Sequence, residues 1–460
     1  MFPAQTYIQR RRRLHDQVGS GVLLFLGNDE SPMNYADNPF HYRQDSTFLY
    51  FFGMSAHGLA AVIDVDEGRE VLFGNDLTVE DIVWMGTQPT LAEKCRSNGI
   101  EEVLSLENLK ECLASARASG RKIHILPPYR AEHVVKLWDL LEIPPDRAEE
   151  AASVEFITAV VDQRNTKTAE EIEELDWAAN ISAEMHLAAM RMARPGLTEA
   201  EIAAAVNQVA LAAGGQLAFP IIATIHGETL HNHFHGNVLK GGDMFLLDAG
   251  AETAMGYAGD LSSTIPVDVF FTPRQKEIYQ VALDAHEAAV AALKPGIPFL
   301  DIHLLACRTV AQGLKDLGFM RGDIDEAVAE GAHALFFPCG TGHMMGLDVH
   351  DMENLGEKFV GYGGEEKSTQ FGLKSLRLAR ELEPGFVLTV EPGIYFIPEL
   401  IDQWKAEKRF EAFINYDKVE TYKDFGGLRN EEEFLITETG YRLLGKPIPK
   451  TIDDVEAMKC

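Results

Sequence analysis

Five ionisable residues stand in otherwise apolar, strand-like stretches of the chain and could together bind metal ions. They are Asp248, Asp260, His343, Glu391 and Glu431. Four carboxylates gathered in a core would repel one another and raise each other's pKa, because unpaired buried charges are unfavourable. Divalent cations remove this repulsion. An oxygen-rich set with one imidazole suits Mn²⁺ best, with Co²⁺, Fe²⁺ or Zn²⁺ as alternatives.

Such a ligand set predicts hydrolytic chemistry. Two metal ions about 3.5–4 Å apart, sharing bridging carboxylates, generate a hydroxide at neutral pH and polarise a carbonyl group. Each residue alone has an ordinary explanation, because an Asp at a strand end is commonly a cap or turn residue and a single His is commonly a core residue. The acidic run from Glu431 to Glu433 would ordinarily form a solvated face. Only the combination supports the metal hypothesis.

Two internal repeats predict the elements that position these residues. Residues 190–206 (MRMARPGLTEAEIAAAV) resemble residues 291–307 (AALKPGIPFLDIHLLAC), with their Pro-Gly pairs 100 residues apart. In both, a helical pattern ends in a cation and Pro-Gly before a second helix begins. The strand-like runs GDMFLLDAG and PGFVLTVEPG also match, at an offset of 143 that aligns Asp248 with Glu391. The sequence therefore predicts a duplicated α/β unit that brings two carboxylates close to a common axis.

The chain before about residue 160 predicts a separate α/β domain. Its strand-like runs are GVLLFLG, STFLYFFG, LAAVIDV, REVLFG and KIHILP. Thr168 with Glu171 three residues later is typical of a capping box that opens a helix. We therefore expect an α/β (α+β) protein with an N-terminal domain over residues 1–165 and a catalytic domain over residues 166–460.

The composition excludes several classes of function. The chain has 460 residues with 71 acidic and 41 basic side chains, so its formal charge is −30. This charge repels polyanions, so no nucleic-acid or membrane partner is expected. The apolar runs are far shorter than the roughly 18 residues of a membrane span. Five scattered cysteines without a C-x-x-C pair predict reduced thiols in a cytoplasmic enzyme.

In their order and motif contexts, the five ionisable residues resemble the metal ligands of the pita-bread metallopeptidases, the family of methionine aminopeptidase, prolidase and aminopeptidase P. The segments FHYRQDSTFLYFFG and DIVWMGTQP are similar to the N-terminal domain of aminopeptidase P. The resemblance covers nearly the whole chain and implies a C-terminal pita-bread catalytic domain. It implies that Asp248 holds one metal ion, that His343 and Glu391 hold the other, and that Asp260 and Glu431 bridge them.

Two histidines resemble further functional residues of this family. His231 has the spacing of a substrate-contacting histidine, although His226, His233 and His235 crowd the same loop. His350 resembles the histidine that stabilises the tetrahedral intermediate, where donors aimed at a developing oxyanion contribute most. The resemblance implies that both residues bind substrate and take part in catalysis.

Three other residues match the family in weaker contexts. Arg429 resembles an arginine that orients the site, and Tyr395 lies in the matching EPGIY sequence and would contact substrate. Trp84 would contact substrate across a subunit interface, or would be an ordinary core residue of its own chain. Related proteins are oligomers, so the resemblance implies a homodimer or homotetramer.

The sequence departs from the family pattern at two places. Asp248 and Asp260 are 12 residues apart instead of the usual 11, which a lengthened hairpin loop can absorb. Cys339 replaces the histidine usually found four residues before the metal-binding histidine. A thiol is a weak donor and titrates differently from imidazole, so we expect an altered pH profile.

The resemblance implies hydrolysis of the N-terminal Xaa-Pro bond of small peptides by a hydroxide that two metal ions activate. Glu391 would manage the proton of this reaction. A prolidase limited to Xaa-Pro dipeptides is the alternative within the class. A non-catalytic binding protein or a metal-free creatinase-like hydrolase are further alternatives, but neither has a physical reason to keep four repelling acids together.

Overall fold

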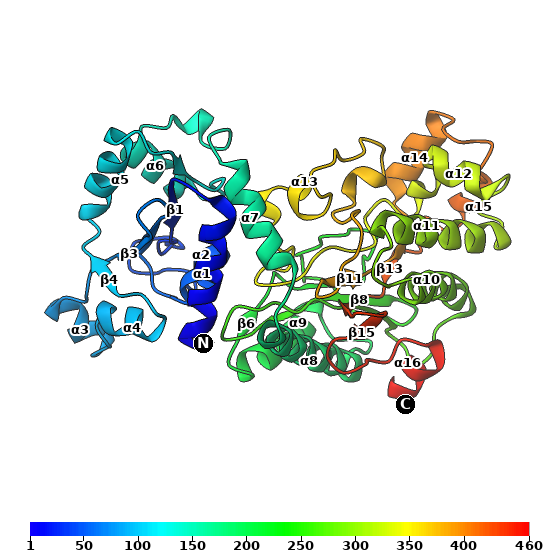
Figure 1. The fold of residues 1–460 in the computed structure, drawn as a ribbon. Coiled ribbons are helices and arrows are strands. Elements are labelled where there is room, and N and C mark those ends of the chain that lie inside the picture. Colours follow the sequence, from blue (N-terminus) through cyan, green and yellow to red (C-terminus); the bar gives the residue numbers. More distant parts are fainter. Residues whose placement is uncertain (460) are drawn as a thin grey trace. The chain divides into compact units, whose positions relative to one another are not determined.

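The computed structural model describes residues 1–459, which form two compact units (Figure 1). The first unit comprises Met1–Arg164 and Met352–Phe359, and the second comprises Asn165–Asp351 and the described residues from Val360 onward. Residues 352–359 group with the first unit, although the sequence prediction included them in the C-terminal domain. No helix within residues 1–459 combines the length and the apolar character that a membrane span requires.

The first unit is built on a five-stranded mixed sheet in the order β4-β3-β2-β1-β5. Its strands are β1 (Val22–Leu26), β2 (Ala60–Asp64), β3 (Arg69–Phe73), β4 (Glu102–Leu104) and β5 (Ile123–His124). Alternate residues of β1, β2 and β3 point to one face, as the period of two dictates, and there they pack against helices α5 (Asn108–Ala118) and α6 (Ala131–Leu141). The other helices before the second unit are α1 (Ala4–Val18), α2 (Ser46–Phe52), α3 (Val79–Met85), α4 (Leu91–Ser97), η1 (Pro145–Arg147) and α7 (Val154–Asn165).

The run STFLYFF forms the helix α2, so the prediction that it is a strand is wrong. The side chain of Asp45 caps this helix by accepting a hydrogen bond from the backbone N–H of Phe48, and Gly53 ends it with a φ of 62°. Six of its seven residues are buried. Because the helix is buried nearly all round, its apolar residues show no helical period, and a short apolar run does not distinguish a helix from a strand.

Long helices surround the strands of the second unit. They are α8 (Ala169–Met192), α9 (Glu199–Ala212), α10 (Pro273–Ala291) and α11 (Phe299–Asp316). The predicted capping box is confirmed, since Thr168 and Glu171 bond reciprocally at the start of α8. The shorter helices are α12 (Ile324–Glu330), η2 (Ala332–Leu335), η3 (Glu353–Leu355), α13 (Glu357–Val360), η4 (Leu373–Ser375), α14 (Pro398–Ala406), α15 (Tyr416–Glu420) and α16 (Ile452–Lys459).

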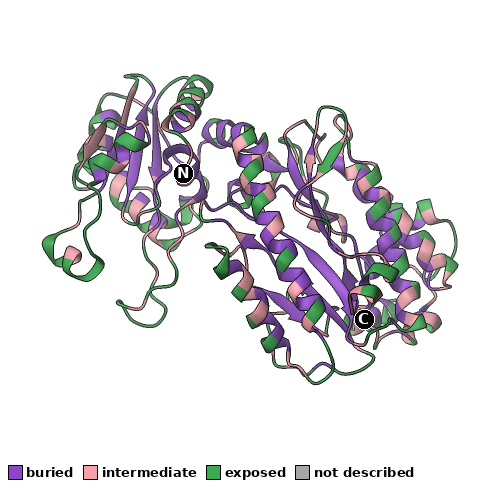
Figure 2. Cartoon of the chain, turned by 90° about the horizontal axis from the view of Figure 1, so that it is seen from below, coloured by how far each residue is buried: buried purple, intermediate pink, exposed green. Residues whose placement is uncertain are grey.

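The strands of the second unit form small antiparallel sheets in the orders β10-β8-β7, β11-β14-β15, β12-β13 and β6-β9. The strands are β6 (Gln216–Leu217), β7 (Ile222–Thr224), β8 (Met244–Asp248), β9 (Ala251–Glu252), β10 (Ser262–Pro266), β11 (Val387–Val390), β12 (Gly393–Tyr395), β13 (Gly427–Arg429), β14 (Glu432–Ile436) and β15 (Tyr441–Leu443). Most of these strands are buried, while the helices expose one side to solvent (Figure 2).

The predicted duplication is confirmed by the backbone hydrogen bonds of the two helix pairs. Gly196, between α8 and α9, donates its N–H to Leu239, and Gly296, between α10 and α11, donates to Leu382, both at 2.9 Å. Both glycines have a positive φ, 95° and 81°, which a residue with a side chain rarely adopts. The two Pro-Gly turns therefore fix each helix pair to its own half of the unit in the same way.

The two halves meet where β10 approaches β14. Ser262, opposite Asp248 in the ladder of β8 and β10, forms an antiparallel bridge with Glu431. The N–H of Glu431 donates to the carbonyl oxygen of Ser262 at 2.9 Å. This bridge joins the ends of two equivalent ladders and brings their polar residues together in the middle of the unit.

Candidate metal centre

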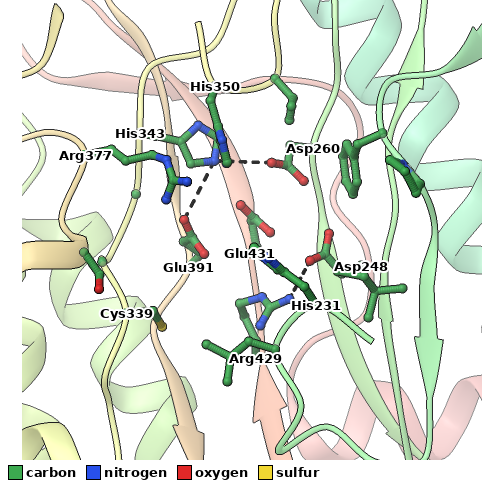
Figure 3. Close-up of a pocket in the computed structure, with 18 of the residues that line it drawn as sticks. His231, Asp248, Asp260, Cys339, His343, His350, Arg377, Glu391, Arg429 and Glu431 are labelled. Carbon is green, nitrogen blue, oxygen red and sulfur yellow. Dashed lines mark hydrogen bonds and ion pairs between the residues drawn. The ribbon is translucent and has the colours of Figure 1, made fainter. Parts of the chain in front are cut away.

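All five ionisable residues line one cavity in the second unit, with a volume of about 240 Å³ (Figure 3). Asp248 is the last residue of β8, Asp260 precedes β10, Glu391 follows β11, and Glu431 precedes β14. His343 lies in a segment whose backbone pairs with β11. Strands from both halves therefore end at the same cavity, as their antiparallel pairing requires.

The imidazole of His343 lies among the carboxylates. Its Nε2 is 3.3 Å from Oδ2 of Asp260 and 3.8 Å from Oε1 of Glu391. One donor atom each from Asp260, His343 and Glu431 lie within 4.8 Å of one another, and all three residues are buried. Three donors this close can bind the same metal ion.

Burial shifts the pKa values of these residues toward their neutral forms. It raises the pKa of Asp260 well above its usual range, and the neighbouring Asp248 and Glu391 raise it further. Burial likewise raises the pKa of Glu431 well above its usual range and raises that of Glu391. It lowers the pKa of His343, so this imidazole is neutral and can act as a metal ligand at neutral pH.

Arg429 connects the two halves beside the cavity. Its Nη2 donates to Oδ2 of Asp248 at 2.5 Å, its Nε to Oγ of Ser262 at 2.9 Å, and its Nη1 to the hydroxyl of Tyr395 at 2.7 Å. Ser262 in turn donates to Oε2 of Glu431 at 2.7 Å. Burial opposes the charge of Arg429, but Tyr395 and the nearby carboxylates raise its pKa well above its usual range. Arg429 therefore stays cationic and orients these side chains.

The residues of the cavity fit divalent metal ions. The two guanidinium groups that line the cavity, those of Arg377 and Arg429, supply two positive charges against four clustered carboxylates. Among the residues described, the buried Oδ1 of Asp260 has no hydrogen-bond partner, although such an atom ordinarily has one. Hard cations would pair with these oxygens, and one neutral imidazole among them suits Mn²⁺ or another first-row ion.

Two of the four histidines in the loop after β7 line the cavity, namely His231 and His233. His226 instead bonds Glu228, and His235 bonds the carbonyl oxygen of Ile221. Burial lowers the pKa of His231, so its imidazole is neutral. The sequence did not decide which of the four histidines could contact a substrate, and the structure reduces these candidates to two.

His350 also lines the cavity. Its ring centroid lies 4.5 Å from that of His343, and the two ring planes meet at 75°. A donor at this place lies close to the carboxylates and faces the same space as His231.

The extra residue between the two aspartates lies in a hairpin that leaves the strand ends in register. Asp248 pairs with Ser262 as a regular ladder position. Between the two aspartates the chain makes a turn in which Thr253 donates its N–H to Tyr257 and Gly256 donates to Thr253, both at 2.9 Å. The longer spacing therefore leaves both aspartates at the cavity.

Cys339 lines the cavity, and its Sγ is 4.0 Å from the hydroxyl of Tyr395. Burial raises the pKa of its thiol to about 12. The thiol is therefore neutral at physiological pH and does not titrate where an imidazole would. Cys95, Cys112, Cys307 and Cys339 are all free thiols, and Cys460 lies outside the described residues.

Trp84 does not pack in the core of its own chain. It lies on α3 in the first unit with 81% of its surface exposed, and Val79 and Val83 of the same helix are 80% and 74% exposed. The interpretation of Trp84 as an ordinary core residue is therefore wrong.

Two residues at the centre were missed by the sequence analysis. Arg377 lines the cavity on the same side as Glu391 (Figure 3). Glu433 is buried and accepts a hydrogen bond from the N–H of Asp260 at 2.6 Å. All three acids of the run Glu431 to Glu433 are buried, which excludes the ordinary alternative of a solvated face. The alternation in the following strand could have revealed Glu433, because residues two apart share a face, whereas no pattern distinguishes Arg377.

Comparisons with known proteins agree with this architecture. The profile of metallopeptidase family M24 matches residues 173–438, and that of the N-terminal domain of aminopeptidase P matches residues 7–125. The chain is 31% identical to a human Xaa-Pro dipeptidase, over 97% of this chain and 90% of that protein. It is 30% identical to the Xaa-Pro aminopeptidase of Escherichia coli, over 99% of this chain and 97% of that protein.

A solved structure of Escherichia coli aminopeptidase P in complex with substrate is also similar. Its TM-score is 0.82 at 29% sequence identity, over 99% of this chain and 98% of that chain. The predicted fold, an N-terminal α/β domain followed by a C-terminal pita-bread catalytic domain, is therefore confirmed. Since the profile match extends over residues 173–438, more than half of the chain, the protein belongs to metallopeptidase family M24.

Proposed function

We propose that the protein is an Xaa-Pro aminopeptidase that removes the N-terminal residue from peptides with proline at position 2. The observation that carries this proposal is the convergence of four acids and one histidine on a single cavity. The likeness to the solved Escherichia coli aminopeptidase P, at a TM-score of 0.82 over 99% of this chain, supports this activity.

Two divalent ions, Mn²⁺ first among the alternatives, would be held by the five residues of the metal centre. Asp248 would bind one ion, His343 and Glu391 the other, and Asp260 and Glu431 both. When bound, the ions supply a nucleophile at neutral pH and polarise the scissile carbonyl. The neutral imidazole of His343 and the unpaired Oδ1 of Asp260 support this assignment.

The remaining steps belong to the side chains of the cavity. The side chain of Glu391 is 20% exposed, more than those of the aspartates and the histidine of the centre, and it would accept a proton from the attacking water and pass it to the leaving nitrogen. His350 would donate a hydrogen bond to the oxygen that becomes negative during attack, and His231 would contact the substrate. Arg429 would hold Asp248 and Tyr395 in place throughout.

The cavity walls suit a proline-containing peptide. Apolar side chains line it next to the acids, from Phe219, Pro220, Ile222, Leu230 and Val349. A volume of about 240 Å³ admits only a few residues of a peptide. The peptide bond before proline has no N–H group. A cavity that binds the substrate through its apolar walls and through contacts to carbonyl groups therefore leaves no substrate N–H of that bond unpaired.

A prolidase is the second candidate, and Arg377 is the observation that favours it. Its guanidinium faces the cavity beside Glu391 (Figure 3), where it could pair with the C-terminal carboxylate of an Xaa-Pro dipeptide. In a longer peptide that carboxylate is replaced by a neutral amide. Binding through Arg377 would therefore favour dipeptides.

Product analysis by mass spectrometry distinguishes the two activities. The Mn²⁺-loaded protein is incubated separately with Ala-Pro, Ala-Pro-Ala and the control peptide Ala-Ala-Ala. Release of Pro-Ala from the second peptide alone supports the aminopeptidase. Cleavage of Ala-Pro alone supports the prolidase, and in that case Arg377→Met should lower its hydrolysis. Cleavage of neither proline peptide contradicts both activities.

Two further assignments complete the proposal. Exposed apolar residues of α3, including Val79, Val83 and Trp84, support a homodimer or homotetramer in which Trp84 contacts a second subunit. Sedimentation of the wild type and of Trp84→Ala tests this assembly. The free thiols support a reducing, cytoplasmic location. The charge of −30 supports small proline peptides as the substrates and disfavours nucleic-acid or membrane partners.

A further inference from the structure

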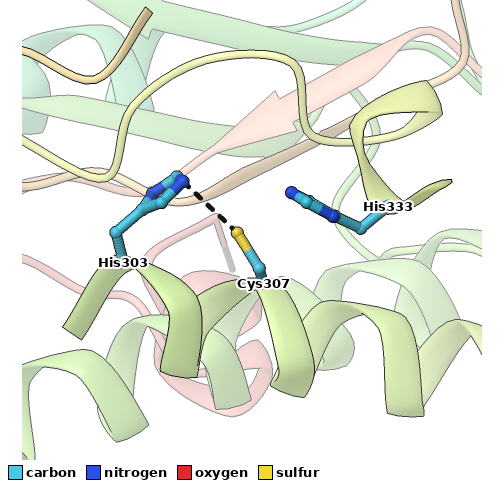
Figure 4. Close-up of side chains that lie close together, drawn as sticks. All are labelled: His303, Cys307 and His333. Carbon is cyan, nitrogen blue, oxygen red and sulfur yellow. Dashed lines mark hydrogen bonds between the residues drawn. The ribbon is translucent and has the colours of Figure 1, made fainter. Parts of the chain in front are cut away.

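Three potential metal-binding side chains lie together in the second unit apart from the cavity. His303 and Cys307 are one turn apart on α11, and His333 comes from the short helix η2 (Figure 4). The three expose 0%, 0% and 1% of their surfaces. None of them lines the cavity of the metal centre.

The donor atoms of this cluster have the spacing of metal ligands. One atom from each residue lies within 4.8 Å of the other two. Sγ of Cys307 is 3.5 Å from Nε2 of His303. A tetrahedral Zn²⁺, about 2.3 Å from sulfur and about 2.1 Å from nitrogen, would separate these two atoms by about 3.6 Å. The pair on α11 is therefore already at ligand distance, and the ring of His333 points toward it (Figure 4).

His333 has no hydrogen-bond partner within the described part of the chain. Both of its ring nitrogens are buried and unpaired. A neutral imidazole carries one donor and one acceptor, and leaving such a group unpaired in a core is unfavourable. A metal ion would supply the missing partner to one of the two nitrogens.

His303 is oriented as a metal-binding histidine would be. Its Nδ1 is 2.8 Å from Oγ1 of Thr341, which leaves Nε2 directed at Cys307. Metal-binding histidines in proteins ordinarily bond their second nitrogen in this way, which fixes the ring. Burial lowers the pKa of His303 to about 3 and that of His333 to about 4, so both rings are neutral and available as ligands.

We propose that His303 Nε2, Cys307 Sγ and one ring nitrogen of His333 bind a borderline or soft transition-metal ion of the Zn²⁺ class. A thiolate and two imidazoles suit Zn²⁺, whereas the oxygen-rich cavity suits harder ions. Binding replaces the S–H bond of Cys307 by an S–metal bond and releases the proton to solvent. The site is buried and apart from the cavity, so the ion would be structural and would tether η2 to α11, with the three side chains filling three of its four tetrahedral positions.

The ion would also stabilise one edge of the metal centre. Thr341, which bonds His303 through its hydroxyl, accepts a backbone hydrogen bond from the N–H of Glu391 at 2.7 Å. Fixing the ring of His303 therefore fixes the backbone position from which Glu391 enters the cavity.

Co²⁺ is the probe that tests this site. A thiolate bound to Co²⁺ gives a strong charge-transfer band in the near ultraviolet, which oxygen and nitrogen ligands do not give. The full chain is produced in cobalt-supplemented medium, so that the ion can enter during folding. We expect this band and about one cobalt more per chain in the wild type than in Cys307→Ser. His333→Gln should weaken the band, and circular dichroism checks that the variants fold.

Two serine variants serve as matched controls. Cys95 is equally buried and free, but it lies in the first unit, so Cys95→Ser should keep the band. Cys339→Ser tests the thiol of the cavity. Absence of the band from the folded wild type would overturn the proposal, as would its loss in Cys339→Ser instead of Cys307→Ser. These outcomes do not depend on peptidase activity.

Discussion

The two halves of the second unit share one backbone plan but bring different side chains to the cavity. In the first half Asp248 ends β8 opposite Ser262, and the register of the second half places Glu391 after β11 opposite Glu431. At equivalent places the first half thus has a hydroxyl where the second has a carboxylate. Asp248 is paired with Arg429, whereas Glu391 lies beside His343.

This difference shows that the two halves share the strands that position the side chains but differ in the chemistry of those side chains. The same register that makes Ser262 equivalent to Glu431 makes Thr224 of β7 equivalent to His343. The imidazole and the most exposed acid therefore both come from the second half. The first half contributes Asp248 and Asp260, and Arg429 ties its strands to the second half. Symmetric strands bring the groups together, and the asymmetric side chains would place the proposed proton acceptor and the imidazole on the side of the second half.

Removing the imidazole should have the largest effect. His343→Ala should lose one of two bound ions and lower kcat/KM by about 1,000-fold, because metal ions contribute several kcal/mol of transition-state stabilisation. Metal analysis and peptide hydrolysis measure the two effects. Thr224→Ser, at the equivalent place of the first half, should keep both ions. Full activity in His343→Ala would contradict the metal centre as assigned.

Removing Arg429, which joins the two halves, should have the second-largest effect. Arg429→Met leaves Asp248 without its cation and breaks the bonds to Ser262 and Tyr395. Breaking a buried ion pair costs about 3–5 kcal/mol, which urea unfolding of the metal-free chain would measure, since no bound ion then compensates Asp248. The matched control is Arg442→Met, which removes a half-exposed pair with Asp176 and should cost at most about 1 kcal/mol. Equal costs in the two variants would show that Arg429 does not join the halves.

Stability measured over a range of pH should distinguish the contribution of the cavity's acids from that of the rest of the protein. In the metal-free chain, burial raises the pKa values of Asp260 and Glu431, so the unfolded state binds fewer protons than the folded state above about pH 4. Metal-free stability should therefore fall as pH rises through the raised pKa values. Bound ions remove this penalty. The free energy of unfolding of the metal-loaded form should therefore increase relative to that of the metal-free form between pH 5 and pH 8.

For each carboxyl group that stays protonated in the folded metal-free chain across this range, the gain is about 1.4 kcal/mol per pH unit. Thermal unfolding with and without chelator at each pH measures it. Buried histidines outside the centre titrate alike in both forms, so their contributions cancel in the difference. A difference that stays constant with pH would show that the acids are not neutralised by metal.

The same contrast explains what the sequence could and could not predict. Asp248, Glu391 and the helix pairs were predictable because the repeat preserves strand ends and Pro-Gly turns. Arg377 was not, because its loop has no periodicity. The two residues of the further cluster on α11 are four apart, but His333 joins them only through tertiary packing. The helix α2 was wrongly predicted because uniform burial removes the helical period.

The smallest effect should come from Cys339, two residues before the segment that pairs with β11. Burial raises the pKa of its thiol to about 12, so it contributes no ionisation to the wild-type pH profile below that value. Cys339→His introduces an imidazole with an ordinary pKa near 6.5, which burial lowers, so a new inflection should appear on the acidic side of kcat/KM. The change at pH 8 should be only a few-fold, because the metal ligands are unaltered. Cys112→Ser, in the first unit, should leave the profile unchanged. An unchanged profile in Cys339→His would place this side chain outside the proton chemistry and confine the asymmetry between the halves to the metal ligands.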